Sequence, residues 1–136
     1  MRFRFYLLLL FLLVSLCTNL SAQYIKEKKL IIGTWLSENS EQKFIFRTNG
    51  MCTLYFSKGG FIQWKYNFTK QLIDCDSSMR GFAEDSTYYL HMKDIKMGYT
   101  DCYVVNSLDS KKLSLSPFGR VGTFLFLKQS QKKSKR

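Results

Sequence analysis

The stretch Phe61–Thr69, which reads FIQWKYNFT, decides the fold because apolar and polar residues alternate along its length. Successive side chains of a β-strand point to opposite faces, so Ile62, Trp64, Tyr66 and Phe68 share one face and the intervening polar residues share the other. The pattern predicts a half-buried strand with one face toward a core and one face in water.

Similar short runs occur along the rest of the chain. They are rich in aromatic and β-branched residues and are separated by Gly, Asn, Asp and Ser, which is typical of strands joined by tight turns. A further short strand is considered at 72–76, and a loop is expected at 77–85. A meander of eight strands avoids exposed edges by closing, so we predict an all-β, eight-stranded antiparallel up-and-down β-barrel. The predicted strands are 30–36, 43–48, 51–56, 61–69, 87–93, 100–108, 113–116 and 121–128.

The dipeptide Asn49-Gly50 separates the second and third predicted strands. Both residues accept the positive φ that a two-residue type I′ turn requires, so we predict such a turn. It would place Phe46 opposite Thr53 and Phe44 opposite Tyr55. One face would then hold Phe44, Phe46, Met51, Thr53 and Tyr55, and the second, wetter face would hold Lys43, Ile45, Arg47, Cys52 and Leu54.

The N-terminus has the three regions of a secretory signal peptide. Two arginines precede the apolar run of residues 5–16, and a polar segment then ends at the small residue Ala22. The run is shorter than the ~20 apolar residues of a membrane-spanning helix. We therefore predict a signal peptide over residues 1–22 and export to the periplasm, the cell surface or the medium.

The chain of 136 residues carries a formal net charge of +11, but much of this charge lies at the two ends of the expected mature chain. We expect residues 23–29 to be a basic lead-in, residues 30–128 to be a single barrel domain, and residues 129–136 to be a basic disordered tail. The basic ends indicate solvated segments rather than a binding face. They predict no specific nucleic-acid partner and a weak attraction of the tail to an anionic cell surface.

Cysteine usage is compatible with an oxidising compartment. Cys52, Cys75 and Cys102 remain after signal cleavage, so a single disulfide would leave one thiol over. We favour a bond between Cys75 and Cys102, since each lies beside an aspartate near an expected strand end, and the other pairings stay open. Lipidation of Cys17 is disfavoured because the bulky Leu16 precedes it.

The sequence shows no recognisable set of catalytic or metal-ligating residues. It has no Cys-x-x-Cys or Cys/His spacing for zinc, no nucleophile motif and no phosphate-binding glycine loop. The single histidine, His91, alternates with apolar Leu90 and Met92 and is expected on the polar side of its strand. We therefore predict a protein that is not an enzyme and has no cofactor and no metal site.

The order of these features resembles that of lipocalin-like domains, members of the calycin superfamily that occur in small exported bacterial proteins. Ile32-Gly33-Thr34-Trp35 is similar to the Gly-x-Trp motif that opens the first strand of that superfamily. Residues 43–56 resemble the next hairpin, residues 103–115 resemble the penultimate hairpin, and residues 121–128 resemble the closing strand.

The resemblance also implies how the floor of the barrel is closed. In lipocalins, a basic residue near the last strand stacks on the tryptophan of this motif in a cation–π contact. Trp35 would be that tryptophan, and Arg120 and Lys128 are the two candidates for the basic residue. Both candidates stay open.

An eight-stranded barrel is wide enough either to be filled by its own side chains or to hold one small ligand. In the first hypothesis, seven aromatic residues line a pocket for a small hydrophobic molecule. In the alternative, they fill the barrel of a protein-interaction module, such as an inhibitor or a surface-associated accessory protein. A cavity of roughly 300 Å³ or more, lined by these aromatic residues, would favour the ligand, and a filled interior with an exposed apolar patch at one rim would favour a protein partner. The seven residues are Phe44, Phe46, Tyr55, Trp64, Tyr66, Phe68 and Tyr88.

Overall fold

The computed structural model describes Tyr6, Lys26 and residues 28–70 and 87–130. The predicted signal peptide, apart from Tyr6, lies outside the described residues, and so do the short strand considered at 72–76, the loop at 77–85 and most of the basic tail. Within the described part of the chain, no helix has the length and apolar character needed to cross a membrane.

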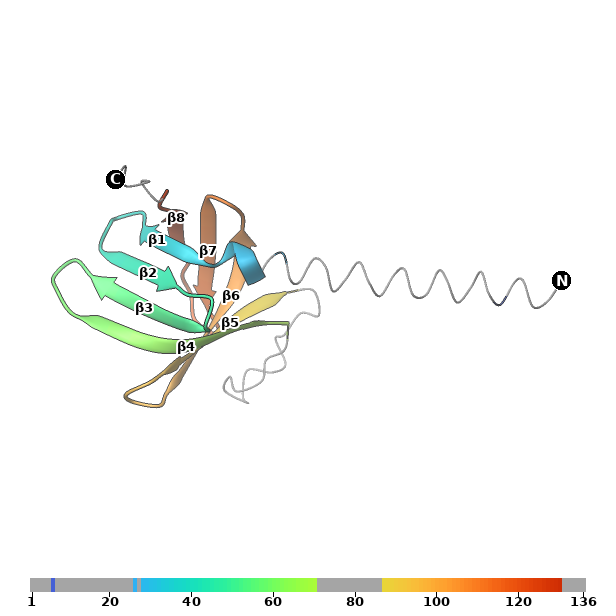
Figure 1. The fold of residues 1–136 in the computed structure, drawn as a ribbon, viewed down its shortest axis with the longest axis horizontal. Helices are drawn as coiled ribbons and strands as arrows, with labels where there is room; N and C mark the ends of the chain where they lie inside the picture. The colour runs from blue at the N-terminus through green and yellow to red at the C-terminus, as the bar shows by residue number, and fades with distance from the viewer. Residues whose placement is uncertain (1–5, 7–25, 27, 71–86, 131–136) are drawn as a thin grey trace.

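Eight strands of the described chain form one closed antiparallel barrel, in which each strand pairs with the next (Figure 1). The last strand returns beside the first and pairs with it, so the sheet closes on itself. The predicted all-β up-and-down barrel is confirmed. The strands are β1 (Gly33–Ser37), β2 (Gln42–Phe46), β3 (Met51–Phe56), β4 (Phe61–Thr69), β5 (Tyr88–Asp94), β6 (Thr100–Leu108), β7 (Lys112–Pro117) and β8 (Phe124–Lys128).

The first strand begins later than predicted. It starts at Gly33 rather than at Leu30, which lies at the end of a short helical segment. Two backbone carbonyl groups before Gly33, those of Leu30 and Ile31, accept hydrogen bonds from side chains instead of from a neighbouring strand. Lys128 Nζ donates a hydrogen bond to the Leu30 carbonyl at 2.7 Å, and Trp35 Nε1 donates one to the Ile31 carbonyl at 2.6 Å.

The last strand also begins later than predicted, at Phe124 rather than at Val121. Val121 is fully exposed in the turn after β7, and Gly122 has a φ of 134°. The hydroxyl groups of Ser116 and Thr123 form a hydrogen bond of 3.0 Å across this turn. The predicted bounds of β3, β4 and β6 are correct, and those of β2, β5 and β7 differ by one or two residues.

The turn between β2 and β3 has three residues rather than the predicted two. The Gly50 N–H donates to the Arg47 carbonyl at 3.3 Å, and the Arg47 N–H donates to the Met51 carbonyl at 2.9 Å. Gly50 has a φ of 78°, whereas Asn49 does not have the positive φ that a type I′ turn requires. The loop therefore matches a type I turn followed by a residue in the left-handed region, the usual three-residue hairpin connection.

The extra loop residue shifts the pairing of β2 with β3 by one position. Phe46 lies opposite Cys52, and Phe44 lies opposite Leu54. These four side chains are buried in the core, so the predicted grouping of Phe44 and Phe46 with Tyr55 is wrong. Because side chains alternate along a strand, a shift of one residue exchanges the two faces of β3.

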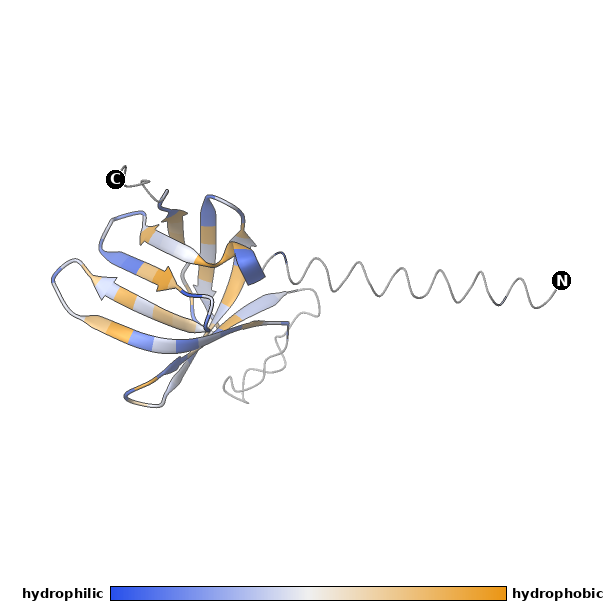
Figure 2. Ribbon diagram, in the orientation of Figure 1, coloured by the Kyte–Doolittle hydropathy of each residue, from blue (hydrophilic) through white to orange (hydrophobic). Residues whose placement is uncertain are grey.

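The alternation predicted for Phe61–Thr69 is confirmed in β4. Trp64 and Phe68 are buried, whereas Lys65 and Asn67, which lie between them in the strand, are exposed. Figure 2 shows the corresponding change between hydrophobic and hydrophilic residues along the strands. The inward side chains of the barrel meet in one core, made of Ile31, Trp35, Phe44, Phe46, Cys52, Leu54, Trp64, Phe68, Leu90, Met92, Leu113, Leu115 and Phe126.

The two tryptophans offer a matched test of how the barrel is held. Both rings are buried, but Trp35 Nε1 has a partner, the Ile31 carbonyl, whereas Trp64 Nε1 has no acceptor among the described residues. Trp35→Phe removes a buried hydrogen bond and weakens a cation–π contact, and Trp64→Phe removes only ring volume and an unpaired donor. We expect Trp35→Phe to lower the free energy of unfolding by about 2 kcal/mol more than Trp64→Phe, as measured by urea denaturation. An equal or larger loss for Trp64→Phe would contradict this assignment.

Candidate functional site

The interior of the barrel is occupied by the aromatic residues that were predicted to line a pocket. Phe44, Phe46, Trp64 and Phe68 each have no more than 4% of their surface exposed, and Tyr66 and Tyr88 are half-buried against the same core. Their rings pack against one another at centroid separations typical of direct contact. The separations are 5.5 Å for Phe44–Phe46, 6.0 Å for Phe44–Trp64, 5.1 Å for Phe46–Tyr66 and 5.0 Å for Phe68–Tyr88.

Tyr55, the seventh predicted lining residue, lies on the outside of the barrel. It pairs with Lys43, whose Nζ is 5.0 Å from the centre of the tyrosine ring. Its other aromatic neighbour is Phe61, at 6.0 Å between ring centroids. The prediction for Tyr55 is wrong because it depended on the two-residue turn, and the three-residue loop reverses the face on which Tyr55 lies.

Lys128 closes the floor of the barrel, and Arg120 does not. Lys128 Nζ lies 4.9 Å from the Trp35 ring centre and also donates to the Leu30 carbonyl. Burial lowers the pKa of Lys128. A side-chain carbon at Gly33 would lie 2.8 Å from the Lys128 Cε, so the glycine leaves the space that the lysine fills. Arg120 is exposed in the turn between β7 and β8.

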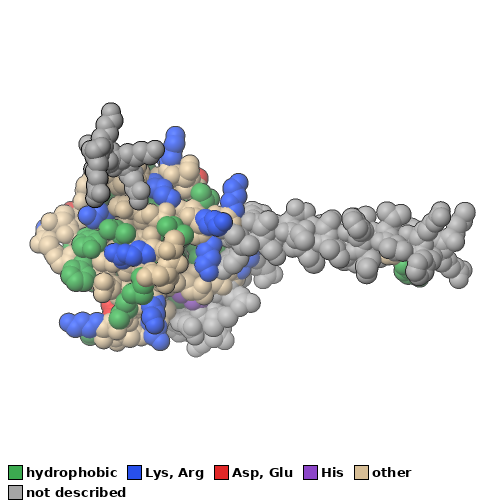
Figure 3. Space-filling model, in the orientation of Figure 1, with side chains coloured by type: hydrophobic (Ala, Val, Ile, Leu, Met, Phe, Trp, Pro, Cys, Tyr) green, Lys and Arg blue, Asp and Glu red, His purple; other side chains and the backbone are tan. Residues whose placement is uncertain are grey.

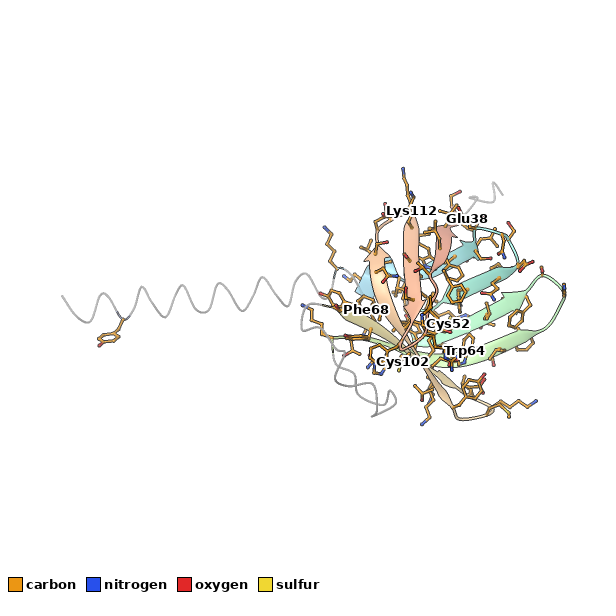
Figure 4. The ribbon with its side chains drawn as sticks, turned by 180° about the vertical axis from the view of Figure 1, so that it is seen from behind. Glu38, Cys52, Trp64, Phe68, Cys102 and Lys112 are labelled. Atoms are coloured by element: carbon orange, nitrogen blue, oxygen red, sulfur yellow. The ribbon has the colours of Figure 1, made fainter. Side chains whose placement is uncertain are left out.

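The cysteines differ in their surroundings. Cys52 is a free thiol, fully buried beside its cross-strand partner Trp64 (Figure 4). Burial raises the pKa of the Cys52 thiol well above its usual range. Cys102 is half-buried on β6, opposite His91. Cys75 lies outside the described residues, so its pairing with Cys102 stays a prediction.

Two weakly acidic side chains, the buried Cys52 and the half-buried Tyr103, are expected to make the fold sensitive to alkaline pH. Burial raises the pKa of Cys52 from an ordinary value of 9.0 and raises the pKa of Tyr103 from 10.0 to about 12. A raised pKa in the folded state means stability that is complete below the unfolded pKa and is lost as pH rises above it. Above pH 9.0 we expect the unfolding free energy to fall by up to about 1.4 kcal/mol per pH unit from Cys52 alone.

The matched control for this prediction is Cys52→Ala, measured by urea denaturation at several pH values. At neutral pH the substitution lowers the free energy of unfolding because it leaves a small cavity. Its decline just above pH 9.0 should nevertheless be shallower than that of the unsubstituted protein, since the remaining groups with a raised pKa among the described residues are tyrosines such as Tyr103, whose ordinary pKa is 10.0. Parallel curves for the two proteins would contradict the role of Cys52.

An exposed apolar surface lies at one end of the barrel, and we call it the apolar rim. It consists of Phe61, Ile95, Met97 and Tyr99, whose exposed fractions are 62%, 48%, 71% and 47%. Together with Ile62, Gln63, Asp94 and Lys96, these residues line a cavity of about 390 Å³. In Figure 3, hydrophobic side chains reach the surface at this end of the barrel among Lys and Arg side chains.

The turn between β5 and β6 holds the apolar rim in place. The buried Asp94 carboxylate accepts hydrogen bonds from the backbone N–H groups of Lys96 at 2.8 Å and Met97 at 2.5 Å. The Ile95 N–H donates to the Gln63 carbonyl on β4 at 3.1 Å. These bonds fix the backbone while its apolar side chains point into water. The sequence analysis did not predict the apolar rim. The signal that could have indicated it is the presence of two large apolar residues, Ile95 and Met97, between two predicted strands.

A second hollow at the surface, of about 450 Å³, lies between the β1–β2 turn and the start of β8. Its polar groups are bonded to one another: Ser37 Oγ donates to Asn39 Oδ1 at 2.7 Å, and Asn39 Nδ2 donates to Glu41 at 2.9 Å. The polar side chains of this turn therefore have hydrogen-bond partners within the turn itself. Among the described residues, no group of three or more His, Cys, Asp or Glu side chains comes together to hold a metal ion.

Comparison with known proteins finds no matching family, no matching curated protein and no matching solved structure. The barrel itself is compatible with a lipocalin-like fold, which is the architecture of many binding proteins.

Proposed function

We propose that this chain is an exported, non-enzymatic protein-interaction module on a lipocalin-like barrel, and that it binds a protein partner through the apolar rim. The observation that carries the proposal is the combination of an interior filled by its own aromatic rings with an apolar patch exposed at one end. An exposed apolar patch bordered by polar residues is a common mark of an interaction site.

The interior is a weaker candidate for binding a small hydrophobic molecule. A ligand inside the barrel would have to displace rings such as Phe44, Phe46 and Phe68, which are almost completely buried by one another and by their neighbours. Opening that space would forfeit packing in a small core. The same rings therefore support the filled barrel of the alternative hypothesis.

The residue types at the apolar rim indicate which chemical groups the partner would present. Met97 and the two aromatic residues, Phe61 and Tyr99, belong to the residue types that are enriched at protein interfaces. Two exposed lysines belong to the same segments: Lys96 lines the rim cavity, and Lys58 lies in the β3–β4 turn that leads to Phe61. We infer a partner that inserts an apolar side chain into the cavity and presents carboxylates to these lysines.

The rim proposal is tested with benzoylphenylalanine, a photo-crosslinking residue, placed at position 97 of the protein produced in its own host. Position 121 is the matched control, because Val121 is fully exposed in a different turn. We expect a discrete crosslinked partner from position 97 and not from position 121. The partner is then identified, purified and titrated. Met97→Ser should weaken its binding about tenfold, and Val121→Ser should leave it unchanged.

Two results would overturn the rim proposal. The first is equal crosslinking from both positions, or binding that Met97→Ser does not change. The second is a small molecule that co-purifies with the protein in native mass spectrometry and is lost on substitution of an interior residue such as Phe68. That result would return the function to the barrel interior.

Export also supports one disulfide. Because Cys52 is buried and free, Cys75 and Cys102 are the pair that we propose. The exported mature chain, denatured and alkylated without reductant, should gain one alkyl group by intact mass, and after reduction it should gain three. Cys52→Ala should gain none before reduction and two after it. More than one alkylated thiol before reduction in the unsubstituted protein would contradict the disulfide.

A further inference from the structure

Two lysines face each other across neighbouring strands on the outside of the barrel. Lys65 on β4 is the direct register partner of Lys93 on β5, and Lys93 in turn pairs with Thr100 on β6. The next register row on the same face contains Asn67 and His91. The polar side chains of both rows line a cavity of about 390 Å³, which we call the basic hollow.

The direct opposition of Lys65 and Lys93 is unfavourable for the protein alone. Like charges at directly opposite positions of an antiparallel pair destabilise a sheet, because their side chains are close together. No carboxylate among the described residues forms an ion pair with either lysine. The arrangement therefore concentrates positive charge over one hollow of the barrel wall.

The remaining groups of the basic hollow suit an anion. Asn67 supplies an amide N–H₂ and Thr100 supplies a hydroxyl, both of which can donate hydrogen bonds to an oxyanion. His91 was predicted to be a surface residue, but it is only 7% exposed and forms part of the wall of the hollow. Lysine ammonium groups act as charged donors to phosphate and sulfate oxygens, where charge-assisted bonds are the stronger kind.

We propose that the basic hollow binds a phosphate or sulfate group, with Lys65 and Lys93 as the two charged donors. The hollow is larger than an inorganic oxyanion needs, so it also has room for part of a molecule that carries the group. Binding would neutralise the opposed charges and so remove the repulsion between β4 and β5. This site is independent of the apolar rim and of the partner proposed there.

The test titrates the full mature protein with sodium phosphate, at an ionic strength held constant with sodium chloride, and follows backbone and side-chain resonances by NMR. We expect saturable shifts at Asn67 and His91. Lys65→Gln and Lys93→Gln should each weaken the apparent affinity about tenfold, the effect of losing one charge-assisted bond. The matched control is Lys112→Gln, an exposed lysine on β7 that is labelled in Figure 4, and it should leave the affinity unchanged.

A second readout separates binding from a purely structural role. Without phosphate and at low salt, Lys93→Gln should raise the melting temperature, because it removes the opposed charge, and Lys112→Gln should not. Phosphate should then raise the melting temperature of the unsubstituted protein more than that of Lys93→Gln. If Lys93 had only a structural role, its substitution would not raise the melting temperature without phosphate and at the same time weaken the stabilisation by phosphate.

A parallel arm identifies the source of the anion. It measures co-sedimentation with phosphatidylglycerol vesicles and with phosphatidylcholine vesicles. Binding to phosphatidylglycerol alone that each lysine substitution weakens, without shifts in free phosphate, would assign the hollow to a lipid headgroup. Shifts in free phosphate that saturate at higher phosphate concentration in each lysine variant would assign it to a soluble ligand. The proposal would be overturned if the protein showed neither shifts in free phosphate nor binding to phosphatidylglycerol. It would also be overturned if neither lysine substitution changed the binding.

Discussion

The barrel depends on the contact that joins its first and last strands. Lys128, at the end of β8, reaches over the Trp35 ring of β1 and binds the Leu30 carbonyl, while Trp35 binds the carbonyl of Ile31. Without this closure, β1 and β8 would be two open edges with unpaired backbone groups. The position of Gly33 follows from the same contact, because any larger residue there would meet the lysine side chain. The backbone pairing of β1 with β8 thus completes the sheet, and the Lys128 side chain covers the Trp35 ring beside the helical lead-in.

Because the interior is filled by its own side chains, both of the proposed binding sites lie on the surface of the barrel. The core rings of β2 and β4 contact one another at distances that leave them little surface for a guest, and the thiol of Cys52 is enclosed among them. Tight packing also makes the barrel a rigid support for its turns. A rigid support is what allows the apolar side chains of the β5–β6 turn to stay exposed instead of collapsing onto the core.

The two surface features differ in chemistry and in location. The apolar rim lies at the turns and combines aromatic residues with methionine, whereas the basic hollow lies on the barrel wall and combines lysines with an amide and a hydroxyl. Both include residues of β4 and of β5, so these two paired strands contribute to both surfaces. A protein partner and an anionic ligand would therefore approach neighbouring parts of the same sheet without sharing a contact residue.

The sequence by itself determined the strand order, the closed barrel and the burial of Trp64 and Phe68, because alternation of polar and apolar residues has only one compatible backbone period. The resemblance to lipocalin-like domains left Arg120 and Lys128 as candidates for the closing cation, and only the pairing of β1 with β8 placed Lys128 over Trp35. The tertiary structure also decided which face Tyr55 occupies, since one extra residue in a turn exchanges both faces of a strand. It likewise brought Lys65 opposite Lys93 and Phe61 beside the β5–β6 turn, because such neighbours arise from register between strands far apart in the chain and leave no local pattern in the sequence.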